Sequence, residues 1–150
     1  MTIKIREAYR SEASVIADFQ MKMALETEDV ELDAAVVERG VNAIFSDEHK
    51  GVYYVGLVED EIVGSLLTTY EWSDWRCSTV WWIQSVFIKN EFRGKGVFKK
   101  MYAHLKGIVE NSPDLAGLRL YVDKSNVKAQ KVYESIGMNG DHYFFYEWMK

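Results

Sequence analysis

The chain has little proline and cysteine, and it lacks any long apolar run. Pro113 is the single proline among 150 residues, and the single cysteine, Cys77, cannot form a disulfide within the chain. A chain without an internal disulfide fits a reducing compartment, so we expect it in the cytoplasm. No apolar stretch approaches the roughly 20 residues that span a membrane. Residues 1–6 alternate as a strand does and lack the apolar core of a signal peptide. We therefore expect neither export nor membrane association.

Basic charge and clustered metal ligands are also scarce. The formal net charge is −5, and no stretch gathers more than a few basic residues. Proteins that bind nucleic acid usually carry a basic patch or stripe, so we expect no nucleic-acid partner. The three histidines, His49, His104 and His142, are far apart in the sequence and show no metal-ligand spacing. We therefore assign no metal.

The residues that are present predict one layered domain over residues 1–150. The apolar fraction of 48% and the length suffice for a proper core. Periodicity and turn signals predict one helix that ends near residue 25, a second over 34–46, a third from 97 to about 111–113, and a fourth over 126–136. They predict strands over 2–7, 52–58, 62–70, 79–88, 117–122 and 143–149. Strands alternating with helices indicate an α/β (α+β) domain, and the early hairpin requires a mixed sheet.

Residues 81–100 form the most informative stretch, because an apolar strand leads through a glycine turn into a helix start. Such a turn presents backbone N–H groups without helical partners, and the helix dipole favours an anion there. Gly94 and Gly96 allow close approach to the backbone, while Arg93, Lys95 and Lys99 add positive charge. These features indicate a pyrophosphate site. The third glycine of a dinucleotide fingerprint is absent, and so is the Gly-Lys-Ser/Thr of a Walker loop.

A second motif follows about thirty residues later, within residues 120–138. Its pattern is Asn126-x-x-Ala129-x-x-x-Tyr133, with Gly137 placed to end the helix. Together the two stretches resemble the acetyl-CoA-binding motif and the second motif of the GNAT N-acetyltransferase superfamily. The order of elements also matches, so the resemblance covers nearly the whole chain. It implies the GNAT fold, which is a mixed, mostly antiparallel sheet flanked by helices. It also implies transfer of an acetyl group from acetyl-CoA to a primary amine, here of a small molecule.

The resemblance also implies roles for individual residues. In the family, backbone amides of the turn and the first helical residues hold the pyrophosphate, and the preceding strand pairs with pantetheine. The amide near Val86 would also polarise the acetyl carbonyl. Asn126 would contact the coenzyme arm, and Tyr133 would protonate the departing thiolate. The matching cofactor-binding residues are Val86, Phe87, Ile88, Arg93, Gly94, Lys95, Gly96, Val97, Phe98 and Lys99. Glu91 and the bulky Phe98 depart from the usual pattern at this turn.

The acceptor side is less constrained by the sequence. A carboxylate or a water chain must take a proton from the amine before it attacks. We expect Glu71 as this base, with Glu28 next, because both regions border the acceptor side in the family fold. Trp72 and Asp74 are expected to contact the acceptor. Gln84 is polar within an apolar strand, so it is either a satisfied core amide or an acceptor contact.

Three interpretations of the function stay open at this point. One is an enzyme, the second is a non-catalytic sensor or regulatory module that binds acyl-CoA, and the third is a nucleotide-binding α/β domain. Tyr133 favours the enzyme, although its position on the apolar side of its helix also suits a core residue. The acceptor, the use of longer acyl groups and the formation of a homodimer are not fixed by the sequence.

Overall fold

The structure is a computed structural model that describes all 150 residues. Contacts between residues divide the chain into two units, residues 1–119 and residues 120–150. The first contains the sheet and three α-helices, and the second contains one α-helix. Each unit is described by itself.

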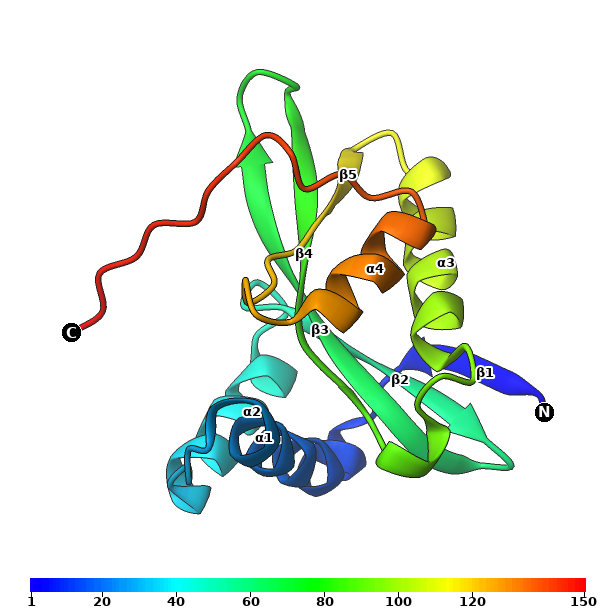
Figure 1. Cartoon of the computed structure of the whole chain (residues 1–150), viewed down its shortest axis with the longest axis vertical. Helices are drawn as coiled ribbons and strands as arrows, with labels where there is room; N and C mark the ends of the chain where they lie inside the picture. Colours follow the sequence, from blue (N-terminus) through cyan, green and yellow to red (C-terminus); the bar gives the residue numbers. More distant parts are fainter. The chain divides into compact units, whose positions relative to one another are not determined.

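The first unit is built on a five-stranded sheet with the order β1-β2-β3-β4-β5 (Figure 1). Strands β1 to β4 pair antiparallel, and β4 pairs with β5 in parallel. The expected mixed, mostly antiparallel sheet is therefore confirmed. The strands are β1 (Ile3–Glu7), β2 (Val52–Val58), β3 (Glu61–Ser73), β4 (Ser78–Ile88) and β5 (Leu115–Arg119).

Helices cover both faces of this sheet. Helices α1 (Ala13–Glu28) and α2 (Ala34–Ser46) pack on one face, against a core that includes Val55 and Leu67. Helix α3 (Val97–Glu110) lies on the other face, as Figure 1 shows. Asp33 caps the start of α2, because its carboxylate accepts hydrogen bonds from the N–H groups of Ala35 and Val36.

A pair of glycines lets α3 approach the sheet closely. Gly56 on β2 is paired with Gly64 on β3. A Cβ atom at Gly56 would lie 3.2 Å from Val97 Cγ1, and one at Gly64 would lie 3.6 Å from the same atom. Val97 is the first residue of α3 and is buried. The missing side chains therefore fix where the N-terminus of α3 meets the sheet.

Several predicted boundaries were wrong. Helix α1 continues to Glu28, so this residue belongs to the last helical turn rather than to a connector. Strand β3 continues to Ser73, so Glu71 and Trp72 lie in a strand rather than a loop, since the long pairing with β4 holds them there. The predicted strand 117–122 is shifted to Leu115–Arg119, and no strand forms over 143–149.

The second unit contains α4 (Val127–Ser135), close to the predicted helix. Asn126 caps it by accepting a hydrogen bond from the N–H of Ala129. Gly137 follows the helix with φ +92°, the left-handed conformation expected of a residue at this position. Beyond it, the Phe145 ring stacks on Tyr121 at 4.8 Å between centroids.

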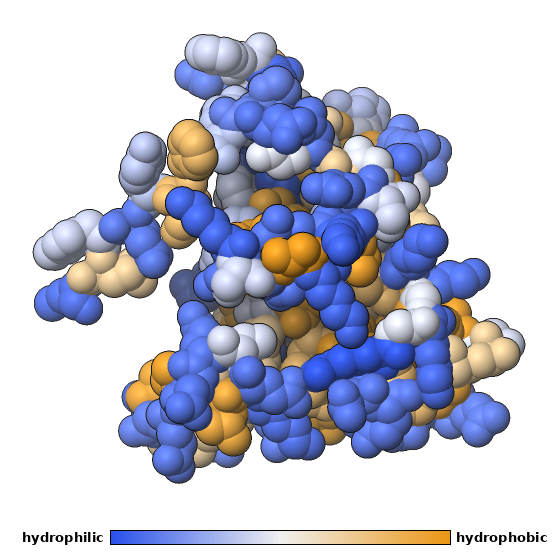
Figure 2. Space-filling view, viewed as in Figure 1, coloured by the Kyte–Doolittle hydropathy of each residue, from blue (hydrophilic) through white to orange (hydrophobic).

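The surface is mostly hydrophilic on the face drawn in Figure 2, with an apolar area at the lower left, over α1 and α2. No helix of the chain combines the length and the apolar character that crossing a membrane would require.

Candidate functional site

The glycine turn before α3 has the backbone conformation that glycine favours. Gly94 has φ +72° and Gly96 has φ +85°, both in the left-handed region. A Cβ atom at either position would meet nothing within 4 Å. Glycine is therefore required here by the backbone itself, and the turn is open to solvent and to a ligand.

The turn presents unpaired N–H groups. Gly94, Lys95 and Gly96 donate no hydrogen bond to any group of the chain. They lead into Val97, the first residue of a 14-residue helix whose first N–H groups lack helical partners. Partial positive charge gathers at such a helix start. The arrangement suits a phosphate group, as the sequence predicted.

The cationic side chains around the turn differ in what they contact. The Arg93 guanidinium donates to the backbone oxygen of Ile88 at 2.8 Å and to the Glu26 carboxylate at 2.6 Å. It therefore ties the turn to the last turns of α1. Lys95 lies over the Phe92 ring, and Lys99 is exposed in the first turn of α3. Of the three, Arg93 has a structural task that the sequence did not indicate.

Strand β4 contains a bulge one residue past Gln84. Leu67 pairs with Gln84, whereas Ser65 pairs with Phe87, so Ser85 and Val86 together oppose Leu66. Ser85 has φ +52°, an uncommon conformation for a residue other than glycine. A bulge leaves backbone groups outside the strand ladder, and such strained residues cluster at functional sites. Nothing in the residue type of Ser85 signals this bulge.

Strands β4 and β5 part just before this bulge. Their pairing ends at Trp82 opposite Arg119, so residues 83–88 have β3 on one side and no strand on the other. The Phe87 side chain is buried and packs on Phe19 at 4.8 Å between ring centroids. At Phe87 the backbone rather than the side chain is therefore available to an extended ligand. The resemblance gives the same role to the backbone of Val86, Phe87 and Ile88.

Glu71 joins three neighbouring strands where β4 and β5 part. Its Oε1 atom accepts from Trp82 Nε1 at 2.8 Å and from Arg119 Nη1 at 2.9 Å. The Trp82 and Arg119 hydrogen bonds lower the pKa of the Glu71 carboxyl group. A carboxylate with a lowered pKa is a weaker proton acceptor. This environment favours a positioning role for Glu71 over the predicted role as base.

The other predicted acceptor residues lie on separate elements. Gln84 donates a hydrogen bond to Thr69 Oγ1, so its amide has a partner within the sheet. Trp72 is opposite Thr79 and points to the face of the sheet away from Glu71 and Gln84, because side chains alternate along a strand. The tryptophan on their face is Trp82. Asp74 is exposed in the β3–β4 turn, and Glu28 is exposed at the end of α1.

The second unit holds the two remaining predicted residues. Tyr133 lies in α4 and is half-buried, and burial raises the pKa of its hydroxyl group. A tyrosine with a raised pKa keeps its proton at neutral pH, which a general acid requires. Asn126 uses its side-chain oxygen as the helix cap described above.

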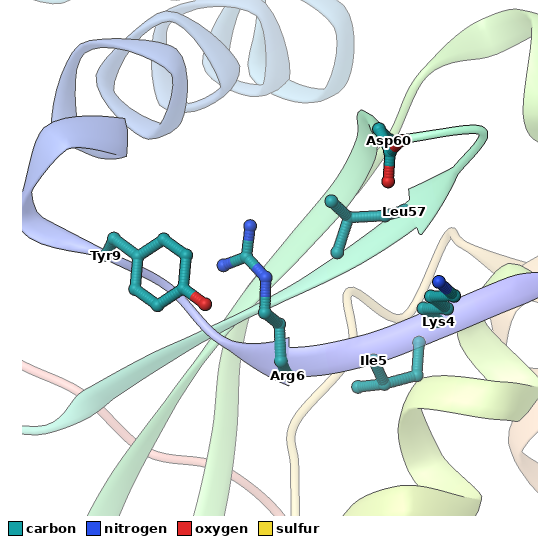
Figure 3. Close-up of a pocket in the computed structure, with 6 residues that line it drawn as sticks. All are labelled: Lys4, Ile5, Arg6, Tyr9, Leu57 and Asp60. Atoms are coloured by element: carbon teal, nitrogen blue, oxygen red, sulfur yellow. The ribbon is translucent and has the colours of Figure 1, made fainter.

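A separate hollow lies at the β1 edge of the sheet (Figure 3). Its volume is about 580 Å³, and its lining shares no residue with the glycine turn or β4. Arg6 lines it, but the Arg6 guanidinium is paired with Glu12 at 2.8 Å and lies 4.0 Å from the Tyr9 ring centroid. No group of three or more His, Cys, Asp or Glu side chains in the chain could hold a metal ion.

Comparison with known proteins assigns the chain to a family. The model of the acetyltransferase (GNAT) family matches residues 14–138, so the chain belongs to this family, which supports acyltransferase activity. The resemblance seen in the sequence is thereby confirmed. A search of curated proteins finds no match.

Solved structures agree with this assignment. A possible acetyltransferase from Clostridium difficile 630 is 42% identical, with TM-score 0.91, covering 100% of this chain and 99% of that one. A ribosomal-protein-alanine N-acetyltransferase from Brucella melitensis shares the fold at 15% identity and TM-score 0.80, covering 99% and 100%. A predicted acetyltransferase with acetyl-CoA from Clostridium acetobutylicum shares it at 15% identity and TM-score 0.73, covering 97% and 96%.

Proposed function

We propose that the protein is an N-acetyltransferase that moves the acetyl group of acetyl-CoA to the primary amine of a small molecule. The observation that carries this proposal is the course of β4. Within a few residues the strand loses its β5 partner, bulges at Ser85 and enters the glycine turn before α3. A backbone edge and an anion site thus follow each other along one strand. This order suits a ligand that joins an extended arm to a pyrophosphate.

The residues present fit acetyl-CoA. The N–H groups of Gly94, Lys95 and Gly96 have no partner in the chain and can donate to the pyrophosphate. The unpaired edge of β4 can pair with the amides of pantetheine, as a peptide adds to a sheet edge. One solved structure of this fold is described with acetyl-CoA.

The thioester of acetyl-CoA supplies the activated acetyl group, and the chain supplies positioning and proton transfer. The Val86 N–H follows the strained Ser85 and would donate to the acetyl oxygen, where negative charge develops. Tyr133 would give its proton to the departing sulfur, in keeping with its raised pKa. Direct attack of the amine in a ternary complex requires no covalent enzyme intermediate. Most of the rate enhancement would come from alignment.

The acceptor would bind on the face of the sheet that carries Gln84, Trp82 and Glu71. Polar groups gather there beside the point where β4 and β5 part. The net charge of −5 favours approach of a cationic amine. Glu71 would hold this region in place, and Glu28 or a water chain would serve as the base.

Release of coenzyme A, followed with a thiol reagent, tests the proposal. The purified protein is supplied with acetyl-CoA and a panel of polyamines, aminoglycosides, amino acids and peptides with free N-termini. We expect turnover with one class of amine, and we expect Tyr133→Phe to lose turnover while binding of acetyl-CoA is kept. Binding without turnover for every amine would instead support a sensor of acyl-CoA. Absence of any acetyl-CoA binding would refute both.

A further inference from the structure

The hollow at the β1 edge is lined by charges of both signs around an apolar floor. Lys4 and Arg6 are two residues apart on β1, so their side chains point to the same face of the sheet. Asp60 belongs to the turn between β2 and β3. Figure 3 draws the Asp60 carboxylate on one side of the hollow and Lys4 and Arg6 on the other, with Leu57 between them. A ligand in the hollow would therefore meet opposite charges on opposite sides.

The positive charge of Arg6 is already balanced within the chain. Its Nη1 and Nη2 atoms donate to the two carboxylate oxygens of Glu12 at 2.9 Å and 2.8 Å. The Tyr9 ring lies against the same guanidinium, with its centroid 4.0 Å from the central carbon. The pair of Arg6 and Glu12 carries no net charge, so Arg6 shapes the wall of the hollow and adds little attraction for an ion.

Lys4 and Asp60, in contrast, have no partner of opposite charge. Both side chains are exposed, and neither takes part in an ion pair of the chain. An anion in the hollow would face Asp60 as a like charge, and a cation would face Lys4 as a like charge. Because complementary charges select a partner and like charges exclude others, the hollow favours a ligand that carries both signs.

The size of the hollow and its apolar lining suit a small organic molecule. The volume of about 580 Å³ lies within the roughly 300–1,000 Å³ of small-molecule sites. Ile5 and Leu57 contribute apolar atoms to the lining, and the Tyr9 ring is 59% exposed. An apolar side chain of a ligand could cover these surfaces, and the burial of apolar area would add to the affinity.

We propose that this hollow binds a free α-amino acid with an apolar side chain. The carboxylate of the amino acid pairs with Lys4, its ammonium group pairs with Asp60, and its side chain packs against Leu57 and Tyr9. The lining shares no residue with the glycine turn or with β4, so this is a second site, separate from that of the reacting amine. This inference does not depend on the proposed activity.

Three related probes test the proposal in titrations followed by the amide signals of the full chain in nuclear magnetic resonance, without acetyl-CoA. L-leucine carries both charges, leucinamide lacks the carboxylate, and isocaproate lacks the ammonium group. At about pH 6.5 the amine of leucinamide stays protonated. L-leucine should give saturable shifts of the amides of residues 4–6 and 57–60. The other two probes should each bind about two- to fivefold more weakly, because each loses one exposed ion pair.

Two variants assign each charge of the ligand to its partner. Lys4→Met should weaken the binding of L-leucine about two- to fivefold and leave that of leucinamide unchanged, because leucinamide has no carboxylate to lose. Asp60→Asn should weaken L-leucine by a similar factor and bind isocaproate no less tightly. Asparagine tolerates the left-handed conformation of Asp60, whose φ is +65°, so the turn should be kept.

Lys106→Met is the matched control, because Lys106 is exposed on α3 and lies outside the lining of the hollow. This variant should bind L-leucine as the wild type does. No saturable binding of L-leucine, equal binding of the three probes, or shifts at β4 in place of the hollow would each overturn the proposal. Weaker binding of leucinamide to Lys4→Met would also overturn it, since the variant would then act through the shape of the hollow and not through a lost ion pair.

Discussion

Glu71 on β3 and Arg119 on β5 are joined by an ion pair, with Oε1 and Nη1 2.9 Å apart, across the intervening strand β4. β4 contributes the Trp82 indole N–H to the same carboxylate oxygen. Trp82 and Arg119 are also the last paired residues of β4 and β5. The ion pair therefore holds the sheet together at the point where the two strands part.

This ion pair predicts that variants of either partner change the KM for acetyl-CoA more than kcat. Arg119→Met should raise the KM for acetyl-CoA and leave kcat nearly unchanged, because the ion pair positions β5 without contacting the reacting atoms. A half-exposed ion pair is worth less than about 1 kcal/mol, which corresponds to a roughly fivefold change. Glu71→Gln should behave in the same way in steady-state kinetics.

The opposite pattern would identify Glu71 as the base. In that case Glu71→Gln would lower kcat by about 10²–10⁴-fold and abolish the acidic limb of the pH–rate profile. Glu59→Gln is the control, since Glu59 is exposed in the turn between β2 and β3 and has no proposed role in the site. It should leave the profile unaltered.

The lowered pKa of Glu71 predicts a dependence of stability on pH. Its ordinary value is 4.5, and the hydrogen bond from Trp82 and the pair with Arg119 lower it in the folded chain. The unfolded chain therefore binds more protons near this pH, so the stabilisation from Glu71 is complete above pH 4.5 and is lost as the pH falls through the folded pKa. At pH 7, urea unfolding should give a larger free energy of unfolding for the wild type than for Glu71→Gln. The difference should shrink as the pH falls below 4.5 and through the lowered pKa of the folded chain. If the difference in the free energy of unfolding did not change with pH, the ion pair between Glu71 and Arg119 would be contradicted.

Alanine in place of Gly96 and alanine in place of Gly107 should have opposite effects on the stability of the chain. Gly96 precedes α3 with φ +85°, whereas Gly107 lies inside α3, and neither Cβ would meet another atom within 4 Å. Gly96→Ala should destabilise by about 1–2 kcal/mol through left-handed strain and weaken acetyl-CoA binding. Gly107→Ala should stabilise by about 0.5–1 kcal/mol and leave binding unchanged. Thermal unfolding and calorimetric titration with coenzyme A measure both. Equal effects would show that the turn conformation is unimportant.

The bulge at Ser85 predicts that glycine and valine at this position have opposite effects on stability, and that valine also lowers turnover. Ser85→Gly should be neutral or stabilising by up to about 1 kcal/mol, because glycine accepts φ +52° more readily. Ser85→Val should destabilise by about 1–3 kcal/mol, since a β-branched residue is strained in this conformation. We expect Ser85→Val to lose turnover because the Val86 N–H is displaced. Full activity in a stably folded Ser85→Val would remove the Val86 amide from the mechanism.

The sequence predicted those features that depend on near neighbours. Gly137 was predicted to end its helix, and its left-handed conformation confirms this. The starts of α2 and α4, near the predicted residues 34 and 126, are likewise set by local hydrogen bonds to Asp33 and Asn126. The bulge was not predicted, because it depends on the register of β4 against β3. The partner of Glu71 was not predicted either, since Arg119 lies 48 residues away. A strand over residues 143–149 was predicted from composition alone, although a strand also needs a pairing partner.

Arg93 couples the affinities of the two proposed ligands. Its backbone belongs to the anion turn, while its guanidinium holds Glu26, two residues before Glu28, at the end of α1. One residue thus links the place proposed for coenzyme A with an element that borders the proposed acceptor site. If coenzyme A shifts Arg93, the affinity for the amine changes by some factor. Thermodynamic linkage then requires the amine to change the affinity for coenzyme A by the same factor.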